Sequence, residues 1–197
     1  MKFEANRLIM LDAAKSAVRV APSYAHAEIL SGILIESNED TGEVYMTATN
    51  HELSIQQKIP ASVQQSGTML INARVLSGMM TKLDSEFATL SAASPEILSV
   101  TGGRCSYQIN CLPSKNYPKP VMPFPEESVL MSGICSLAKR TTFAVSSSEH
   151  QLALQCVQVK LKNNAVHAAA CDGDKMMLIR DSAESTEERE FLLPEMN

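Results

Sequence analysis

The sequence contains no tryptophan, and only 5% of its 197 residues are aromatic. No apolar run comes near the roughly 20 residues that a helix needs to span a bilayer. The residues that follow Met1-Lys2-Phe3-Glu4 also lack the apolar stretch of a signal peptide. We therefore expect a cytoplasmic protein without a membrane partner.

Disulfide and metal-binding patterns are also missing. The five cysteines are an odd number, and none belongs to a CxxC pair, so neither a disulfide framework nor a zinc site is indicated. We predict buried thiols and no cofactor. The cysteines are Cys105, Cys111, Cys135, Cys156 and Cys171.

An excess of positive charge is absent as well. The formal net charge is −5, and residues 1–120 carry 10 basic and 11 acidic side chains while residues 121–197 carry 7 and 11. Proteins that bind nucleic acid through bulk attraction to phosphate are normally basic. A nucleic-acid role would therefore depend on local placement of charge. Hydrophobic residues make up 45% of the chain, which is enough for a globular core.

Proline is concentrated in one stretch. Residues 111–125 read CLPSKNYPKPVMPFP and hold five of the nine prolines. Because proline fixes φ and lacks an amide donor, this composition favours an extended connector with few hydrogen bonds. We predict that it divides the chain into a first domain with its linker, residues 1–125, and a second part, residues 126–197.

Before this connector, the spacing of apolar residues predicts a strand, a helix and three strands, and then the same order again. The predicted strands are 2–5, 29–36, 43–50, 51–59, 68–71, 87–93, 96–102 and 104–110, and the helices are 8–20 and 73–84. The predicted buried arcs of the helices are Met10, Leu11, Ala14, Ala17 and Val18 in the first and Val75, Leu76, Met79, Met80 and Leu83 in the second.

After the connector the pattern begins again. It predicts a strand at 128–133, a helix at 134–145, strands at 152–162, 165–171 and 175–181, and a further strand within 191–197. The segments ILSGILIES…VYMTATNHELSI and LALQCVQVK…VHAAACDGDKMML match when shifted by 122 positions, which brings Thr49-Asn50 onto Cys171-Asp172. Chance similarity between β-rich segments is the alternative.

Three motifs, MKF, NCLPSKNYP and ACDGDKMML, stand in this order along the chain. Together they resemble the bacterial DNA polymerase III beta subunit family, the sliding clamps. The resemblance implies an α+β DNA clamp fold, in which repeated β-α-β-β-β units place helices on one face of antiparallel sheets. Family members have three similar domains per subunit, and two subunits close a ring around duplex DNA. This chain would supply the first domain and about half of the second, as a fragment or as a short relative.

The resemblance also implies a function. A chain of this family would be a non-enzymatic processivity factor of DNA replication, a homodimer that encircles double-stranded DNA and tethers DNA polymerase III. The alternative is a clamp-derived protein-binding module that does not hold DNA, which the net negative charge favours.

The helices of a clamp line its hole, so their polar arcs would face DNA. Each of the three predicted arcs carries two basic residues, which would contact phosphate without reading sequence. Ordinary solvated helix faces are the alternative. The basic pairs are Lys15 and Arg19, Arg74 and Lys82, and Lys139 and Arg140; the resemblance adds the loop positions Tyr24, Ser148 and Gln151.

The resemblance further implies an apolar pocket for short linear peptides from DNA polymerase III and clamp-loader subunits. Asp174 stands where the family commonly has histidine, and ordinary core packing is the alternative for the apolar members. The matching positions are Leu154, Cys171, Gly173, Lys175 and Met176.

Two segments offer acid, base or nucleophile types and raise the alternative of a small metal-dependent hydrolase. Asp172-Gly173-Asp174 could form a metal site, but a tight turn explains the same residues without a ligand. His51-Glu52 and Ser148-Glu149-His150 are sequence neighbours, which point to opposite faces of an extended strand. We predict that the protein is not an enzyme.

An incomplete second domain would leave the apolar arc of helix 134–145 half covered. The arc consists of Ile134, Leu137, Ala138, Thr141 and Ala144. Exposed apolar surface of that size tends to find a partner, so we expect a second copy to cover it in a homo-oligomer. Leu137→Asp would then disrupt the dimer.

Overall fold

The computed structural model describes residues 1–22, 28–120, 133–148, 151–183 and 188–194. The chain forms two compact units, Met1–Met122 and Pro123–Asn197, called the first and the second unit below. Most of the strand predicted at 128–133 lies outside the described residues. Within the described ranges, none of the helices has the length and apolar character needed to cross a membrane.

The first unit contains two helices and eight strands among its described residues, in the predicted order. This confirms the repeated strand-helix-three-strand pattern. The elements are β1 (Lys2–Asn6), α1 (Arg7–Val20), β2 (Gly32–Asn38), β3 (Glu43–Thr49), β4 (Ser54–Gln65), β5 (Gly67–Asn72), α2 (Ala73–Lys82), β6 (Phe87–Ser94), β7 (Ile97–Gly102) and β8 (Cys105–Asn110), with a 3-10 helix η1 (Glu28–Ser31) before β2.

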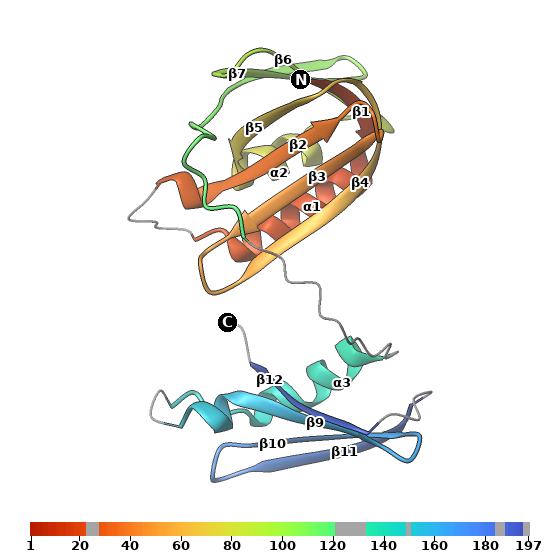
Figure 1. Cartoon of the computed structure of the whole chain (residues 1–197), viewed down its shortest axis with the longest axis vertical. Coiled ribbons are helices and arrows are strands. Elements are labelled where there is room, and N and C mark those ends of the chain that lie inside the picture. Colours follow the sequence, from red (N-terminus) through yellow and green to blue (C-terminus); the bar gives the residue numbers. More distant parts are fainter. Residues whose placement is uncertain (23–27, 121–132, 149–150, 184–187, 195–197) are drawn as a thin grey trace. The chain divides into compact units, whose positions relative to one another are not determined.

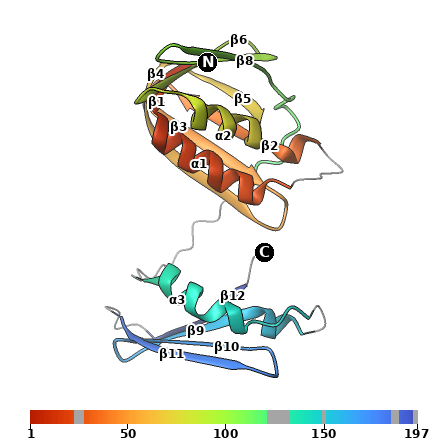
Figure 2. The ribbon, with the colours of Figure 1, turned by 180° about the vertical axis from the view of Figure 1, so that it is seen from behind.

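All eight strands form one antiparallel sheet, in the order β5-β2-β3-β4-β1-β6-β7-β8. The first strand of each half thus pairs with the second strand of the other half, which ties the two halves together. Helices α1 and α2 lie side by side on one face of this sheet (Figures 1 and 2). The opposite face is called the outer face below.

The two helices begin in the same way. The Asn6 side chain accepts hydrogen bonds from the amides of Leu8 (2.9 Å) and Ile9 (3.3 Å). The Asn72 side chain does the same for Arg74 (3.1 Å) and Val75 (3.2 Å). Each asparagine ends a strand and caps the following helix, so the repeat extends to the residue that satisfies the first free amides.

The buried helix faces agree with the prediction in most positions. α1 buries Met10, Ala13, Ala14, Ala17 and Val20. α2 buries Ala73, Leu76 and Met80, while Val75 is 42% exposed. The prediction for Val75 was therefore wrong, because the stripe formed by residues 73, 76 and 80 leaves position 75 outside it.

The first half of the proline-rich stretch is not a loose connector. The Leu112 amide donates to the Leu70 carbonyl at 2.8 Å, and Tyr117 is only 5% exposed. Leu34, Leu70 and Tyr117 form a small cluster on the outer face of β2 and β5, with Leu112 packed against it. This part of the stretch therefore covers the sheet of the first unit.

The second unit repeats half of this design. Its sheet order is β11-β10-β9-β12, which corresponds to β4-β3-β2-β5 of the first unit. Its elements are α3 (Ile134–Thr141), η2 (Thr142–Ala144), η3 (Leu152–Gln155), β9 (Cys156–Lys162), β10 (Ala165–Cys171), β11 (Met176–Ser182) and β12 (Arg189–Pro194).

The apolar arc of α3 is covered within its own unit. Leu137 is 4% exposed and Ala144 is fully buried, in one cluster with Val157 and Val159 of β9. The expectation of a half-exposed arc was therefore wrong, because the four-stranded sheet already covers it. Leu137→Asp would consequently disturb this core, whatever the oligomeric state.

The two units match with two different shifts. In β3 and β10, Thr47 corresponds to Ala169, which is a shift of 122. Thr47 pairs with Leu34, and Ala169 pairs with Gln158, so β2 and β9 correspond with a shift of 124. The turn between β2 and β3 has four residues, 39–42, and the turn between β9 and β10 has two. Both turn residues of the second unit, Asn163 and Asn164, have positive φ, as a two-residue hairpin turn of type I′ requires. The single predicted shift of 122 was thus wrong for the first strand.

The prediction of buried thiols was also wrong. Cys135 is exposed, and the other four cysteines are partly exposed. Cys135 lies on the solvent side of α3 two residues before the buried Leu137. A small apolar residue type does not by itself decide which face of an element it occupies.

Candidate nucleic-acid interface

The exposed face of α1 and α2 carries four of the predicted DNA-binding residues. Lys15 and Arg19 lie one turn apart on α1, and Arg74 and Lys82 lie near the two ends of α2. All four are exposed. Because the helices lie side by side on one face of the sheet, these residues share that face of the first unit (Figure 2).

The helices concentrate positive charge in an acidic chain. Helices α1, α2 and α3 together hold seven Lys or Arg residues and one acidic residue, Asp12. The remainder of the 17 basic and 22 acidic residues is therefore ten basic and 21 acidic. Charge of opposite sign is thus separated between the helices and the rest of the chain, as local phosphate binding requires.

In the second unit, Lys139 and Arg140 are exposed on α3, as predicted. Arg140 Nη1 lies 3.6 Å from Asp181 Oδ2 on β11, and both side chains are more than half exposed. An exposed pair at this distance is weak, so it neutralises Arg140 only in part. Lys139 is the stronger candidate of the two for a phosphate contact.

The helix face also carries apolar side chains that were not predicted there. Leu8 is 59% exposed and Ile9 is 44% exposed in the first turn of α1, and Val75 is exposed in the first turn of α2. The capping asparagines that precede both helices mark this turn in the sequence. The asparagine signal was present in the sequence, but the spacing of apolar residues alone did not distinguish Leu8, Ile9 and Val75 from core residues.

The predicted loop positions Ser148 and Gln151 lie in a compact segment before β9. The Ser148 amide donates to Ser146 Oγ at 3.1 Å, and the Ser148 carbonyl accepts from the Gln151 amide at 3.3 Å and from Gln155 Nε2 at 3.1 Å. Both side chains are exposed. Tyr24 lies outside the described residues.

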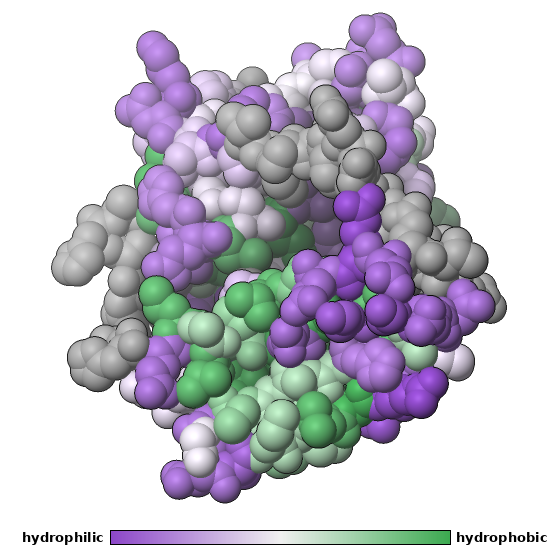
Figure 3. All heavy atoms as spheres, turned by 60° about the horizontal axis from the view of Figure 1, so that its bottom comes forward, coloured by the Kyte–Doolittle hydropathy of each residue, from purple (hydrophilic) through white to green (hydrophobic). Residues whose placement is uncertain are grey.

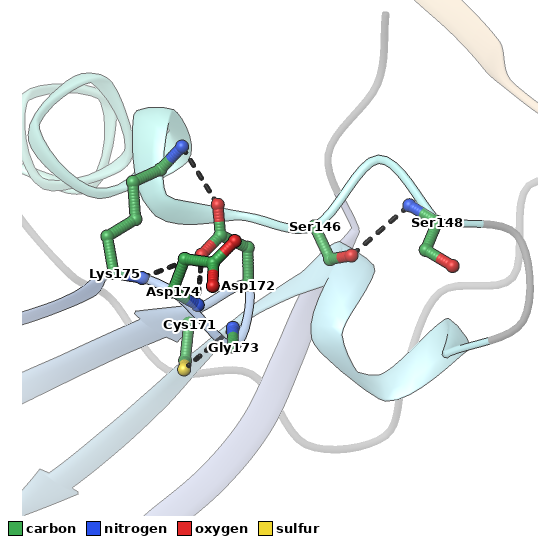
Figure 4. A network of polar contacts seen from close by, with 7 residues as sticks. All are labelled: Ser146, Ser148, Cys171, Asp172, Gly173, Asp174 and Lys175. Atoms are coloured by element: carbon green, nitrogen blue, oxygen red, sulfur yellow. Dashed lines mark hydrogen bonds and ion pairs between the residues drawn. The ribbon is translucent and has the colours of Figure 1, made fainter.

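The Asp172-Gly173-Asp174 segment is a tight turn between β10 and β11 (Figure 4). Asp172 Oδ1 accepts from the amides of Asp174 (3.0 Å) and Lys175 (2.8 Å), and Asp172 Oδ2 lies 2.8 Å from Lys175 Nζ. Gly173 has φ of 99°, which residues with a side chain rarely adopt. Both carboxylate oxygens of Asp172 are therefore bonded within the turn, in agreement with the tight-turn interpretation.

These bonds also control ionisation in the turn. The side chain and the amide of Lys175 lower the pKa of Asp172 from 3.8 to about 2. The same pair raises the pKa of Lys175 above its usual value. At neutral pH both groups are charged, and each is partly satisfied by the other.

The five positions predicted for a peptide pocket lie at one end of the second sheet. Cys171 ends β10 and pairs with Met176, the first residue of β11, while Gly173 and Lys175 form the turn between them. Leu154 lies two residues before the start of β9, is half-buried, and accepts from the Ser146 amide at 2.8 Å. Met176 is 61% exposed, so it is not core in this unit.

The segments raised as catalytic candidates do not form a cluster in the described part of the chain. His51 and Glu52 are exposed in the turn between β3 and β4. Glu149 and His150 lie outside the described residues. Across the described ranges, no three His, Cys, Asp or Glu side chains are grouped so that they could hold a metal ion.

Known proteins resemble this chain along most of its length. It is 25% identical to the beta sliding clamp of Synechococcus elongatus, with 88% of this chain and 47% of the relative covered. The crystal structure of the Bacillus subtilis DNA polymerase sliding clamp matches with a TM-score of 0.83 and 22% identity, covering 98% of this chain and 54% of that one. A sliding clamp of Pseudomonas aeruginosa, solved bound to griselimycin, also gives a TM-score of 0.83, at 18% identity and with 98% and 53% covered.

These likenesses support the predicted α+β clamp fold, and the chain spans about half the length of the clamps it matches. The sequence model of the DNA polymerase III beta subunit, N-terminal domain, matches residues 1–123, which is more than half of the chain. The chain therefore belongs to the DNA polymerase III beta subunit family.

Proposed function

We propose that this chain is part of a sliding clamp, a processivity factor that encircles duplex DNA in the cytoplasm and tethers DNA polymerase III. In this proposal the residues 1–125 serve as the first clamp domain, and residues 126–197 as part of a second. Two subunits form the ring, as the family resemblance implies, and the chain has no catalytic activity of its own.

The separation of charge carries the DNA part of this proposal. Seven of the eight charged residues on α1, α2 and α3 are basic, in a chain of net charge −5. Exposed lysine and arginine side chains bind phosphate without reading bases, which suits a protein that must move along any sequence. The contacts are few, so we expect weak binding that depends strongly on salt.

A charge-reversal experiment tests the helix face. The triple variant Lys15→Glu, Arg19→Glu and Lys82→Glu should lower the affinity for labelled duplex DNA, measured by fluorescence anisotropy at low and moderate salt. Each phosphate contact that is lost should also reduce the slope of log affinity against log salt by about 0.9.

A matched control separates local contacts from net charge. Lys2→Glu, Arg104→Glu and Lys115→Glu change the net charge equally at exposed positions outside the helices. This control should retain most of the binding. Equal losses in both triple variants, or no binding of the unaltered chain to linear or nicked circular DNA at either salt, would reject the DNA proposal and favour the protein-binding alternative.

We also propose that the end of the second sheet contributes to a site for short linear peptides of DNA polymerase III and of the clamp loader. Met176 is exposed beside Cys171 and the rigid turn at Gly173, which supports a fixed apolar contact point. Met176→Ser should weaken binding of a labelled clamp-loader peptide to this chain. Met177→Ser at the half-buried neighbouring position should instead lower stability.

A further inference from the structure

The sheet of the second unit, called the second sheet, has an outer face that points away from α3. This face has a shallow pocket apart from the sites described above. It has a volume of about 330 Å³, near the lower end for ligand pockets and large enough for a side chain. Its outward-facing lining combines apolar and basic residues from three neighbouring strands. These residues are Gln158, Lys160, His167, Ala169, Leu178 and Arg180.

The apolar part of this surface is exposed. Leu178 of β11 pairs with Ala169 of β10, and Leu178 is 67% exposed. Leu192 of β12 continues the same row beyond Gln158 and is 53% exposed. Figure 3, which brings the sheet of the second unit forward, shows hydrophobic residues gathered together, with hydrophilic residues at their border.

A basic row runs beside the apolar one. His167 pairs with Arg180 on one side and with Lys160 on the other. Lys160 has a partner, since its Nζ lies 3.2 Å from Glu190 Oε2. In the described part of the chain, neither His167 nor Arg180 makes a side-chain hydrogen bond or an ion pair.

The matching row of the first unit is balanced internally. Lys58, Tyr45 and Glu36 occupy the positions of Arg180, His167 and Lys160. There, Lys58 forms an ion pair with Glu43, and Glu36 forms one with Lys119. The second sheet has Lys160 at the position of Glu36 and Leu178 at the position of Gln56.

The apolar residues differ between the units as well. In the first unit, Leu34 and Leu70 on the outer face are covered by Leu112 and Tyr117 of the same chain. Gln158 and Leu192 stand at the corresponding positions of the second unit, where Leu192 is 53% exposed. Leu178, at the position of Gln56, is 67% exposed. In the described part of the chain, the second sheet therefore presents the unpaired side chains of His167 and Arg180 next to the exposed apolar residues Leu178 and Leu192.

We propose that this surface docks an acidic peptide segment of a partner protein. Arg180 and Lys160 lie two strands apart, which is about 10 Å. In a polyproline II segment, residues three apart point the same way and lie about 9 Å apart. One carboxylate at that spacing pairs with Arg180, a second competes with Glu190 for Lys160, and an apolar side chain beside them fills the space over Ala169 and Leu178. The apolar row favours a peptide over nucleic acid, whose phosphates would find no partner there.

Binding of a designed peptide tests the proposal. The probe is a fluorescein-labelled octapeptide with aspartates three residues apart and two leucines, measured by anisotropy against the full chain at low salt. Leu178→Ser should weaken binding about tenfold, because the contact area of one leucine is lost. Arg180→Glu should weaken it at least as much and reduce its salt dependence.

The controls distinguish the proposed site from general stickiness. Leu8→Ser and Lys115→Glu alter an exposed leucine and an exposed cation of the first unit and should leave binding unchanged. Far-UV circular dichroism and the milder Arg180→Gln variant guard against misfolding. A probe with serine in place of leucine should bind more weakly.

Three results would overturn the proposal. One is equal loss in the site and control variants. Another is displacement of the probe by duplex DNA in a way that depends on Arg180, which would make the row a nucleic-acid surface. The third is concentration-dependent self-association that Leu178→Ser abolishes, which would make a second copy of this chain the occupant.

Discussion

Replacing Tyr117 by phenylalanine removes a hydroxyl group that holds together the ends of two strands. This hydroxyl accepts from the Thr49 amide at 3.1 Å and lies 3.3 Å from the Gly32 carbonyl and 3.5 Å from the Thr47 carbonyl. β2 begins at Gly32 and β3 ends at Thr49, and the ladder of paired residues between these strands ends at Leu34 and Thr47. The hydroxyl thus takes the place of the next ladder bond.

The cost of Tyr117→Phe follows from burial. Tyr117 is 5% exposed and Thr49 is 2% exposed, so water cannot easily replace the lost group. A buried amide without a partner costs about 1–3 kcal/mol. For a chain of this size, each kcal/mol lowers Tm by about 2–4 °C.

Tyr45→Phe is a matched control with the same chemical change. The Tyr45 hydroxyl donates to Glu43 at 2.7 Å on the partly exposed outer face, where water can replace it. This variant should lose less than about 1 kcal/mol. Urea unfolding followed by far-UV circular dichroism suits both variants, because the signal does not depend on tyrosine fluorescence. If Tyr117→Phe destabilises the protein no more than Tyr45→Phe, the reasoning about this hydroxyl is refuted.

Three further substitutions test helix α2 and the turn between β10 and β11. Gly78→Ala on α2 should raise the free energy of unfolding, measured in urea, by about 0.5–1 kcal/mol, since a Cβ there meets no atom within 4 Å. Gly173→Ala should lower the free energy of unfolding, because Gly173 has a positive φ. A change of the same sign in both variants would contradict this reasoning. The pKa of Asp172 is depressed, so its pairing contributes fully above pH 3.8 and is lost as the pH falls through about 2. Lys175→Met should raise the pKa of Asp172 towards 3.8 in a carboxyl NMR titration. The pKa should stay below 3.8, because the amides of residues 174 and 175 still donate to the Asp172 carboxylate. An unchanged midpoint would show that the ammonium group has no part in the shift.

The order of elements could be predicted because apolar spacing reports which face of each element is buried. α1, β3 and β10 are examples in which the periodic residues are also the core residues. Element ends were less accurate. Residues 29–31 and 152–155, predicted as strand, are 3-10 helix, because the strand pairing begins only at Gly32 and Cys156.

The candidate site was predictable only where a helix presents a polar arc. Lys15 and Lys139 are exposed because the opposite arcs of their helices enter the core. Val75 and Cys135 could not be placed in this way, since an apolar residue beside the buried stripe has the same local pattern as one within it. The covering role of Tyr117 depends on contacts with Gly32 and Thr49, more than 65 positions away in the chain, which no local pattern reports.

The comparison of the two sheets explains why fold and surface differ in predictability. The inward-facing residues Ile33 and Ile35 of β2 correspond to Val157 and Val159 of β9, and these apolar positions set the register. The outward-facing positions between them take no part in that choice. The same arrangement of strands therefore carries Glu36 in the first unit and Lys160 in the second. The spacing of apolar residues predicts this arrangement, while the chemistry of the outer face varies independently of it.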